Sequence, residues 1–430
     1  MFEFTGASAM LFLPRELAER ILIFCHPRDV SNFAQTCRGA HNLVYKSKDQ
    51  YLWRELFLEL PFDDLRKAVL PFGAKKVDFD WKMELQRRIE AEKVAQSAIE
   101  GPAFTRALQT FMSVIETALP ATATPGTDST NLLWLDGVLQ KCAFHYFLVP
   151  SSERQLHGRL RAYLALWHEN GDTDESRRRL NVLRRTSRCY VYDLRKYEEE
   201  TLWGPYVVGE KGIKVNWEHM EHIVTVVAMK LRELPLLALQ IYGYPVPGLG
   251  GLRAYSAPHS FSRKAHDWAG VSGVWRRFVC FMDYRDLFAF NFSSSRNGAR
   301  DPSFFGENYQ EAIRPVELHL EVVDPEDGAD AETITDYPPL FFKGFSRGSH
   351  SGEAAVEGSV RFLSDGCIRW FFVTKYDGLT QWSAEGVQLG NVCSMAGVAG
   401  IWTGAFHEEA DPAGPFWMWK AHSALPFYHN

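Results

Sequence analysis

The sequence predicts an α+β fold in which a helical N-terminal part precedes a mainly antiparallel β part. Apolar residues recur at helical spacing over much of the chain up to Leu119. From Trp275 onward, short alternating apolar runs are separated by turn residues about every ten positions, which is typical of a barrel or sandwich. Aromatic residues make up 14% of the chain, and large rings at that frequency are typical of sheet cores.

The N-terminal residues predict compact helices. Leu17, Ile21 and Phe24 recur at helical spacing, and Pro14 stands where a helix start tolerates proline. Pro27 predicts the end of this helix, because proline lacks a backbone N–H and disfavours helical geometry in the residue before it.

Two further helices are predicted before position 60. Asp29 is expected to be the N-cap of the first of them. Their apolar stripes comprise Val30, Phe33, Ala34 and Cys37 in one helix, and Leu52, Trp53 and Leu56 in the other.

Shifts in composition divide the chain into four expected segments. A second helical region runs from about Asp78 to Leu119 and is interrupted at Gly101-Pro102. The small polar residues of 120–130 are typical of a linker. The expected segments are 1–60, 61–130, 131–260 and 261–430.

The third segment mixes helices with a strand. The pattern predicts a helix over Leu156–Trp167 and another over Trp217–Leu231, the latter with Asn216 as its N-cap. The alternating β-branched and aromatic residues of Arg188–Leu194 predict a strand between them.

The fourth segment carries the strongest strand signals. We expect a strand pair over Trp275–Phe292 that turns at Asp283–Asp286, and a further strand over Val316–Val323. Asp365-Gly366 predicts a two-residue hairpin turn. The acidic stretch Asp324–Asp336 is expected to be an exposed loop.

Charge and cysteine usage exclude several classes of protein. A net charge of −6 disfavours nonspecific binding to nucleic acid, which needs a basic face. The arginine-rich run from Arg177 to Arg188 is interpreted as a solvated helix face. No apolar run reaches the ~18–20 residues that span a bilayer, and Met1–Met10 lacks the pattern of a secretory signal. Seven scattered cysteines without a CxxC pair favour reduced thiols in the cytoplasm or nucleus.

The sequence carries no recognisable catalytic pattern. His219 and His222 stand three residues apart on a predicted helix and lack a third ligand, so we interpret them as part of an exposed polar helix face. Asp283 and Asp286 flank Arg285, which is expected to neutralise their turn. Nucleophile-elbow, phosphate-loop and dinucleotide fingerprints are missing. We therefore expect no enzymatic activity, no metal and no cofactor.

The N-terminal pattern resembles an F-box over about residues 11–58. The resemblance rests on four ordered blocks: Leu13-Pro14-x-Glu16-Leu17-x3-Ile21-Leu22, Asp29-Val30, Thr36-Cys37-Arg38 and Tyr51-Leu52-Trp53-Arg54-Glu55-Leu56-Phe57. It implies that segment 1–60 is a three-helix F-box and 61–130 a helical linker region. Known F-boxes bind the Skp adaptor of Skp–cullin–F-box (SCF) ubiquitin ligases. The resemblance thus implies a non-catalytic substrate-recognition adaptor that binds Skp and, through it, a cullin.

Nine residues match positions that face the adaptor or build the F-box core, and the sequence alone does not separate these two roles. A three-helix unit of this size is too small to bury all its apolar positions, so some are expected to be covered by a partner. The nine residues are Leu13, Pro14, Leu17, Ile21, Val30, Phe33, Cys37, Leu52 and Trp53.

The rest of the chain resembles fungal F-box proteins with a large β-rich C-terminal region, on pieces such as Leu202-Trp-Gly-Pro205 and Gly400-Ile-Trp-Thr-Gly404. This implies that the β domain binds an unknown protein target. Target binding is expected on loops, which carry exposed aromatic and arginine residues. The expected loops are Tyr244–Tyr255, Phe341–His350 and His407–Phe416, and the second supplies the candidate residues Phe341, Phe342, Phe345 and Arg347.

Two alternatives to a pure adaptor remain open at this point. The β domain could be a lipocalin-like binder of a small molecule that gates partner recognition. An aromatic-lined cavity of several hundred Å³ would favour that reading, and a barrel filled by its own side chains would reject it. A hydrolase or transferase fused to an adaptor-binding segment is the other alternative, which the missing motifs disfavour.

Overall fold

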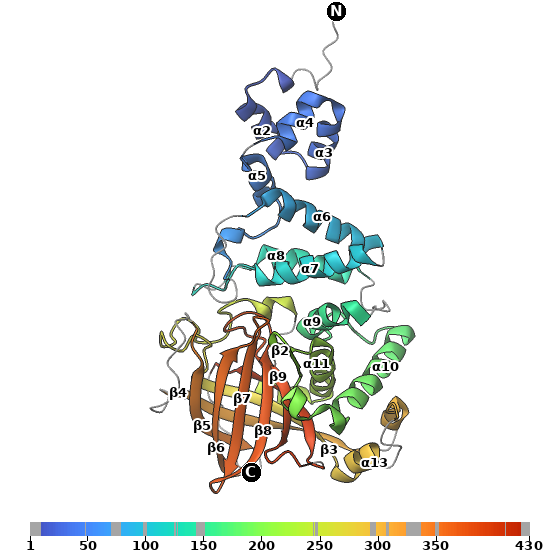
Figure 1. Ribbon diagram of the computed structural model, residues 1–430, viewed down its shortest axis with the longest axis vertical. Helices are drawn as coiled ribbons and strands as arrows, with labels where there is room; N and C mark the ends of the chain where they lie inside the picture. Colours follow the sequence, from blue (N-terminus) through green and yellow to red (C-terminus); the bar gives the residue numbers. More distant parts are fainter. Residues whose placement is uncertain are drawn as a thin grey trace, which may run out of the picture. The chain divides into compact units, whose positions relative to one another are not determined.

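Figure 1 shows the computed structural model of the chain. It describes residues 10–47, 49–69, 79–97, 101–123, 126, 128–142, 151–243, 245, 248–292, 298–306, 309–323, 337–348, 352–408 and 410–422. The acidic stretch Asp324–Asp336 lies outside these residues. The chain forms two compact units, one comprising residues 1–68, 75–119 and 129–145, and the other comprising 69–74, 120–128 and 146–430.

The described part of the first unit is helical. Its α-helices are α2 (Arg15–Ile23), α3 (Pro27–Thr36), α4 (Arg38–Tyr45), α5 (Tyr51–Glu59), α6 (Trp81–Ser97), α7 (Pro102–Glu116) and α8 (Thr130–Gln140). The predicted break at Gly101-Pro102 is confirmed, since it separates α6 from α7.

Prolines and caps set the ends of the first helices. Pro14 is the N-cap of α2, as its place near a helix start predicts. Pro27 is the first residue of α3. A backbone N–H at that position has no acceptor within the helix, so proline is tolerated there. The prediction that Asp29 is the N-cap of α3 was wrong. His26 is the N-cap, because its Nδ1 accepts a hydrogen bond from the Arg28 backbone N–H at 3.2 Å. Asp29 instead lies in the first turn.

A buried carboxylate joins the two ends of the predicted linker 120–130. Asp63 accepts hydrogen bonds from the backbone N–H groups of Leu119 at 2.7 Å and Thr130 at 2.9 Å, and from the Ser129 hydroxyl. Asn131 accepts from the backbone N–H of Asp63 at 3.0 Å. Buried polar groups satisfied in this way fix how α7 and α8 meet.

The second unit combines helices with a barrel. Its α-helices are α9 (Arg154–Leu164), α10 (Asp174–Val191), α11 (Trp217–Arg232), α12 (Leu236–Tyr242) and α13 (Tyr284–Phe292), and a hairpin is formed by β1 (Tyr206–Gly209) and β2 (Gly212–Val215). The predicted N-cap of α11 is confirmed, because the Asn216 side chain accepts from the His219 backbone N–H at 3.2 Å. Helix α11 packs against α9, α10 and strands of the barrel (Figure 1).

Eight antiparallel strands close the barrel, which confirms the predicted α+β class with a barrel-like C-terminal part. The strands are β3 (Gly273–Met282), β4 (Glu311–Val323), β5 (Leu340–Gly348), β6 (Glu353–Phe362), β7 (Ile368–Tyr376), β8 (Leu379–Gln388), β9 (Val398–Gly404) and β10 (Ala413–Lys420). Their order is β10-β3-β4-β5-β6-β7-β8-β9, so neighbouring strands follow the chain and closure leaves no sheet edge. Asp365-Gly366 lies between β6 and β7, but the turn is longer than the two residues predicted, because the Leu363 N–H donates to the Cys367 carbonyl at 2.8 Å and leaves three residues between them.

Large side chains fill the barrel interior. Trp370, Phe342, Phe372 and Phe416 are each at most 1% exposed. Glycines make room for the rings: a Cβ on Gly358 would lie 2.7 Å from Cζ of Phe342. Interiors packed by rings in this way resemble a protein core more than a ligand cavity.

The strand predicted over Arg188–Leu194 was wrong. Arg188 to Val191 form the last turn of α10, and Leu194 begins a 3₁₀ turn. The helix places Arg188 and Tyr192 one turn apart, so that both side chains hydrogen-bond the buried carboxylate of Glu311. This tertiary contact overrides the β propensity of the segment.

The strand pair predicted over Trp275–Phe292 was half wrong. The first half is β3, but Tyr284–Phe292 forms α13. Asp283 starts that helix, because its side chain accepts from the Arg285 backbone N–H at 3.0 Å and its carbonyl accepts from the Leu287 N–H at 2.9 Å. Leu287 and Phe290 then pack in a small cluster with Tyr192 and other rings.

The arginine-rich run in α10 only partly forms a solvated face. Arg177 and Arg179 make exposed ion pairs with Asp174 and Glu175, as expected. Arg188 departs from the interpretation, since its side chain is fully buried. Among the residues that the structure describes, no helix combines the length and apolar composition that crossing a bilayer requires.

Candidate functional site

Helix α2 is apolar on two faces. One face carries Ala18 and Leu22, which are buried in the core of the first unit. The other carries Leu17 and Ile21, one turn apart, which are 53% and 46% exposed. A helix on the surface of a folded protein usually turns its second face to water with polar residues, so this second apolar face needs an explanation.

The exposed apolar residues continue beyond both ends of α2. Leu13 precedes the helix and is 39% exposed, and Phe24 follows it at 73%. Pro14 is exposed between them. We call Leu13, Leu17, Ile21 and Phe24 the α2 stripe; Leu17 and Ile21 lie one turn apart on the helix, and Leu13 and Phe24 stand just beyond its two ends.

Three of the sequence candidates build the core instead. Val30, Leu52 and Trp53 are buried, at no more than 6% exposure. The Trp53 indole N–H donates to the Val44 carbonyl at 3.2 Å, so its polar atom is satisfied inside the unit. These residues support the surface that the α2 stripe presents and do not form that surface themselves.

The two remaining candidates, Phe33 and Cys37, belong neither to the buried core nor to the α2 stripe. Phe33 is partly buried and packs against the core cluster. Cys37 is exposed and acts locally: its Sγ accepts from the Ala40 backbone N–H at 3.4 Å and so caps α4. Of the nine residues, Leu13, Pro14, Leu17 and Ile21 share an exposed surface.

Polar groups adjoin α2. Arg15 and Glu19 form an ion pair at 2.8 Å along the helix. Glu16 and Glu19 line one side of a pocket of about 490 Å³, and Tyr51 and Arg54 of α5 line another. The α2 stripe is thus an apolar strip with a charged neighbour, which is the usual composition of a protein-binding surface.

The comparison with protein families agrees with this geometry. Residues 10–49 match the F-box domain family. The chain contains an F-box. F-box domains generally bind the Skp adaptor and through it a cullin, and proteins that carry them are generally non-catalytic adaptors of SCF ubiquitin ligases. Neither the curated proteins nor the solved structures contain a match to the chain.

The F-box match ends before α5 begins, so Leu52 and Trp53 lie outside the matched residues while packing in the same core. Phe24 lies inside the F-box and was missed as a site residue. Its signal was available, because it stands seven residues after Leu17 and therefore on the same helical face.

The target-binding candidates lie on a strand. The prediction of a loop over Phe341–His350 was wrong for the described residues. Phe341–Gly348 belong to β5, which pairs with β4 and β6. Residues alternate between the two faces of a strand. Phe342 accordingly faces the interior and is 1% exposed, while Phe341 faces outward at 38%.

Three of the four candidates therefore share the outer face of β5. The Phe345 ring stacks on His319 of β4 with centroids 4.6 Å apart, and the Arg347 guanidinium lies 4.7 Å from the Phe345 centroid. Arg347 also pairs with Glu353 at 2.9 Å. We call Phe341, Phe345 and Arg347 the β5 outer strip.

The two histidines of α11 are not on an exposed polar face, so that interpretation was wrong. His219 is 3% exposed, and its Nε2 lies 3.2 Å from the Tyr197 hydroxyl. Nδ1 of His222 lies 3.0 Å from the Ser187 hydroxyl. Burial lowers the pKa of His222 to about 4, against an opposing effect of Glu218, and also lowers the pKa of His219 well below its ordinary value.

No metal site accompanies these histidines. Within the described part of the chain, no group of three or more histidine, cysteine, aspartate or glutamate side chains is arranged to hold a metal ion. Arg285 pairs with Asp283 at 3.4 Å, as the sequence predicted, and the backbone N–H of Gln310 donates to Asp286 at 2.7 Å. The two aspartates therefore serve the turn before α13.

Proposed function

We propose that this protein is the substrate-recognition adaptor of an SCF-type ubiquitin ligase, with the α2 stripe binding the Skp adaptor and the barrel unit binding the target. One observation carries the proposal: the residues that match an F-box leave the apolar side chains of the α2 stripe exposed. Exposed apolar contact area is the main driving force for association when a partner covers it.

The expected partner surface has a definite chemistry. Leu17 and Ile21 would insert side chains into an apolar groove, in the way that helix-in-groove interfaces use residues at i and i+4. Burying a leucine or isoleucine side chain contributes roughly 1.5–3 kcal/mol, so two or three of them account for much of a stable interaction.

The function that follows from these contacts is proximity. A target held on the barrel unit would have its lysines near the ubiquitin-charged enzyme, which turns a bimolecular encounter into an effectively unimolecular one. The chain itself would supply no reacting group. The lowered pKa values of His219 and His222 are explained by their burial and require no catalytic role.

The β5 outer strip is the proposed starting point for target contacts. Phe341 is exposed, and Phe345 and Arg347 lie further along the same face of β5. Aromatic and arginine side chains are enriched among residues that dominate binding energy.

The lipocalin-like alternative has less support. It requires a cavity inside the barrel, whereas Trp370 and Phe372 are buried there by their neighbours at 0% and 1% exposure. Phe342 and Trp275 pack against Trp370 from two sides. A filled interior favours the adaptor proposal, because it leaves the outer surface of the unit for recognition.

Affinity purification with mass spectrometry tests the proposal. The full chain would be captured from cells with the proteasome blocked, and Skp adaptor, cullin and enriched targets would be quantified against a Leu17→Asp/Ile21→Asp variant. We expect the variant to lose adaptor and cullin while retaining targets. Equal recovery of the adaptor by both proteins would overturn the proposal. Trp53→Ala is unsuitable here, because Trp53 is 6% exposed and its removal would disturb the fold.

A further inference from the structure

The second unit contains an open pocket of about 530 Å³ outside the barrel interior. Described residues from three parts of the chain line it: the turn region 194–203 after α10, the end of α13 together with Arg300, and residues at and after the end of β9, namely Thr403, His407, Glu408, Asp411 and Ala413. The last segment includes the start of His407–Phe416, one of the loops that the sequence suggested for target binding. The pocket is large enough for one or two amino-acid side chains.

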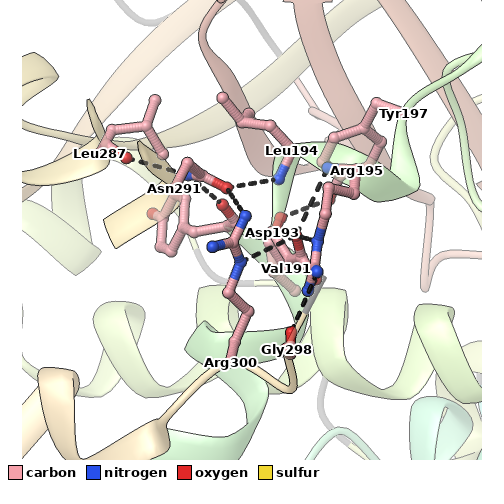
Figure 2. A network of polar contacts seen from close by, with 10 residues as sticks. Val191, Asp193, Leu194, Arg195, Tyr197, Leu287, Asn291, Gly298 and Arg300 are labelled. Carbon is pink, nitrogen blue, oxygen red and sulfur yellow. Dashed lines mark hydrogen bonds and ion pairs between the residues drawn. The ribbon is translucent and has the colours of Figure 1, made fainter. Parts of the chain in front are cut away.

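Two arginines of the lining, Arg195 and Arg300, converge on the carboxylate of Asp193 (Figure 2). Asp193 accepts from Nε and Nη2 of Arg195, both at 2.8 Å, and from Nε of Arg300 at 3.3 Å. Asn291 accepts from Nη2 of Arg300 at 3.4 Å and donates to the Tyr192 and Leu287 carbonyls, both at 2.9 Å. The two arginines are therefore held in place by groups from several elements.

One nitrogen of the Arg300 guanidinium, Nη1, has no hydrogen-bond partner among the described residues. The Arg300 side chain is 5% exposed, and Nη1 itself is buried. A buried donor without an acceptor costs free energy, which an acceptor from a ligand offsets. Arg300 lines the pocket, so that acceptor would lie inside it.

An aromatic pair forms part of the wall. The rings of Trp203 and His407 stack with centroids 3.9 Å apart and an interplanar angle of 9°. Both residues hold left-handed backbone conformations, with φ of 51° and 54°. Nδ1 of His407 lies 3.3 Å from the Thr403 hydroxyl. Burial lowers the pKa of His407 despite the nearby Asp411, so the stacked imidazole is neutral at neutral pH.

The lining carries more negative than positive charge. Four carboxylates, those of Glu198, Glu199, Glu408 and Asp411, lie in it with the two guanidinium groups. Glu199 and Glu408 are exposed at the rim. A phosphate group would meet this negative rim unfavourably, whereas a cation is attracted to it and to the face of an indole such as Trp203.

We propose that this pocket binds a basic peptide segment: a carbonyl or carboxylate oxygen accepts from Nη1 of Arg300, and a lysine or arginine side chain lies against Trp203 and the acidic rim. The binding itself does not depend on the F-box. That the peptide belongs to the protein presented for ubiquitination rests on the proposed function.

The test uses the immobilised full chain and randomised hexapeptide libraries with a fixed central lysine, acetyl-lysine or glutamate, each as free acid and as amide. We expect retention of the lysine library to exceed that of the other two by at least about fivefold, the effect of one favourable charge contact of about 1 kcal/mol. Preference for the free acid identifies a chain-terminal carboxylate as the acceptor, and equal retention of acid and amide identifies a backbone carbonyl.

Variants decide whether this pocket is responsible. Arg300→Met should reduce retention of all lysine peptides, and Glu199→Gln/Glu408→Gln should abolish the preference for lysine. The double variant changes only exposed side chains, so it reports on binding even if Arg300→Met lowers the melting temperature. Glu210→Gln, an exposed acid on the β1–β2 hairpin, is the matched control and should bind like wild type. Equal retention of the lysine and glutamate libraries, or a lysine preference that survives in both variants, overturns the proposal. Adaptor recovery should be unchanged in all of them, which separates this test from that of the F-box.

Discussion

Arg188 at the end of α10 donates from Nη2 and Nε to one carboxylate oxygen of Glu311 at the start of β4, at 2.6 Å and 2.9 Å. Both side chains are almost completely buried. The Tyr192 hydroxyl donates to the other carboxylate oxygen at 2.7 Å, so one carboxylate joins the helix to the barrel.

Breaking this pair from one side should destabilise the second unit strongly. Glu311→Gln leaves Arg188 buried without its counter-charge, and we expect a loss of about 3–5 kcal/mol in the free energy of unfolding. Replacing both residues, as Arg188→Met/Glu311→Gln, should recover part of that loss, because no unpaired charge remains. Urea unfolding followed by circular dichroism measures both, and a single variant as stable as wild type would refute this role.

The histidines of α11 predict acid sensitivity. The pKa of His222 is lowered by burial to about 4 in the folded protein, while in the unfolded chain it is about 6.5. Between these values the unfolded state binds the proton and the folded state does not, so stability falls as the pH drops from 6.5 towards 4. The loss from this residue is at most about 3 kcal/mol.

His222→Gln keeps a hydrogen-bonding partner for Ser187 and removes the titration. Its urea midpoint should fall less than that of wild type between pH 7 and pH 4.5. Parallel decreases in the two proteins would show that His222 contributes nothing to the pH dependence.

Arg277 lies in the barrel interior between the rings of Phe372 and Phe416, 5.0 Å and 4.4 Å from their centroids. Burial lowers its pKa to about 9. A charged guanidinium held without a carboxylate partner among the described residues is costly, so Arg277→Met should raise the free energy of unfolding by about 1–3 kcal/mol. Arg277→Ala is the control, since it removes the charge but leaves a cavity and should destabilise. A methionine variant less stable than wild type would contradict this account of the interior.

Phe341 and Phe342 are neighbours on β5, and together they test which face of the strand points into the barrel. Phe342→Ala should cost about 3–5 kcal/mol because it empties part of the barrel core, whereas Phe341→Ala should change stability by no more than about 0.5 kcal/mol. Thermal melts of the two variants compare them directly, and similar melting temperatures would be inconsistent with the assigned register.

The β part shows which features a sequence can predict. Alternation and the Asp365-Gly366 signal depend on neighbours in the chain, so the strand over Val316–Val323 and the place of the turn between β6 and β7 were predicted. The segment from Arg188 to Leu194 was not, because its conformation is set by Glu311, more than a hundred residues away. Alternation also could not reveal that Phe341 and Phe342 occupy a strand, since their run reads equally as an exposed aromatic loop.

The functional surface was partly predictable for the same reason. Leu17 and Ile21 follow from helical spacing within one short segment. The separation between the exposed Leu17 and the buried Trp53 required the packing of four helices. The sequence singled out only the His407–Phe416 part of the Arg300 pocket, because the lining comes from three distant parts of the chain.

The affinity of the purified full chain for a purified Skp adaptor tests the central claim most directly. Isothermal titration calorimetry would compare wild type with Leu17→Asp/Ile21→Asp, and with Leu133→Asp as the control, which introduces one aspartate at a 61% exposed leucine of α8 outside the F-box. We predict that the α2 variant binds at least about a hundredfold more weakly, a loss of about 2.8 kcal/mol, and that the α8 variant binds like wild type. Equal dissociation constants for wild type and the α2 variant, both folded by circular dichroism, would contradict the claim that the α2 stripe binds the adaptor.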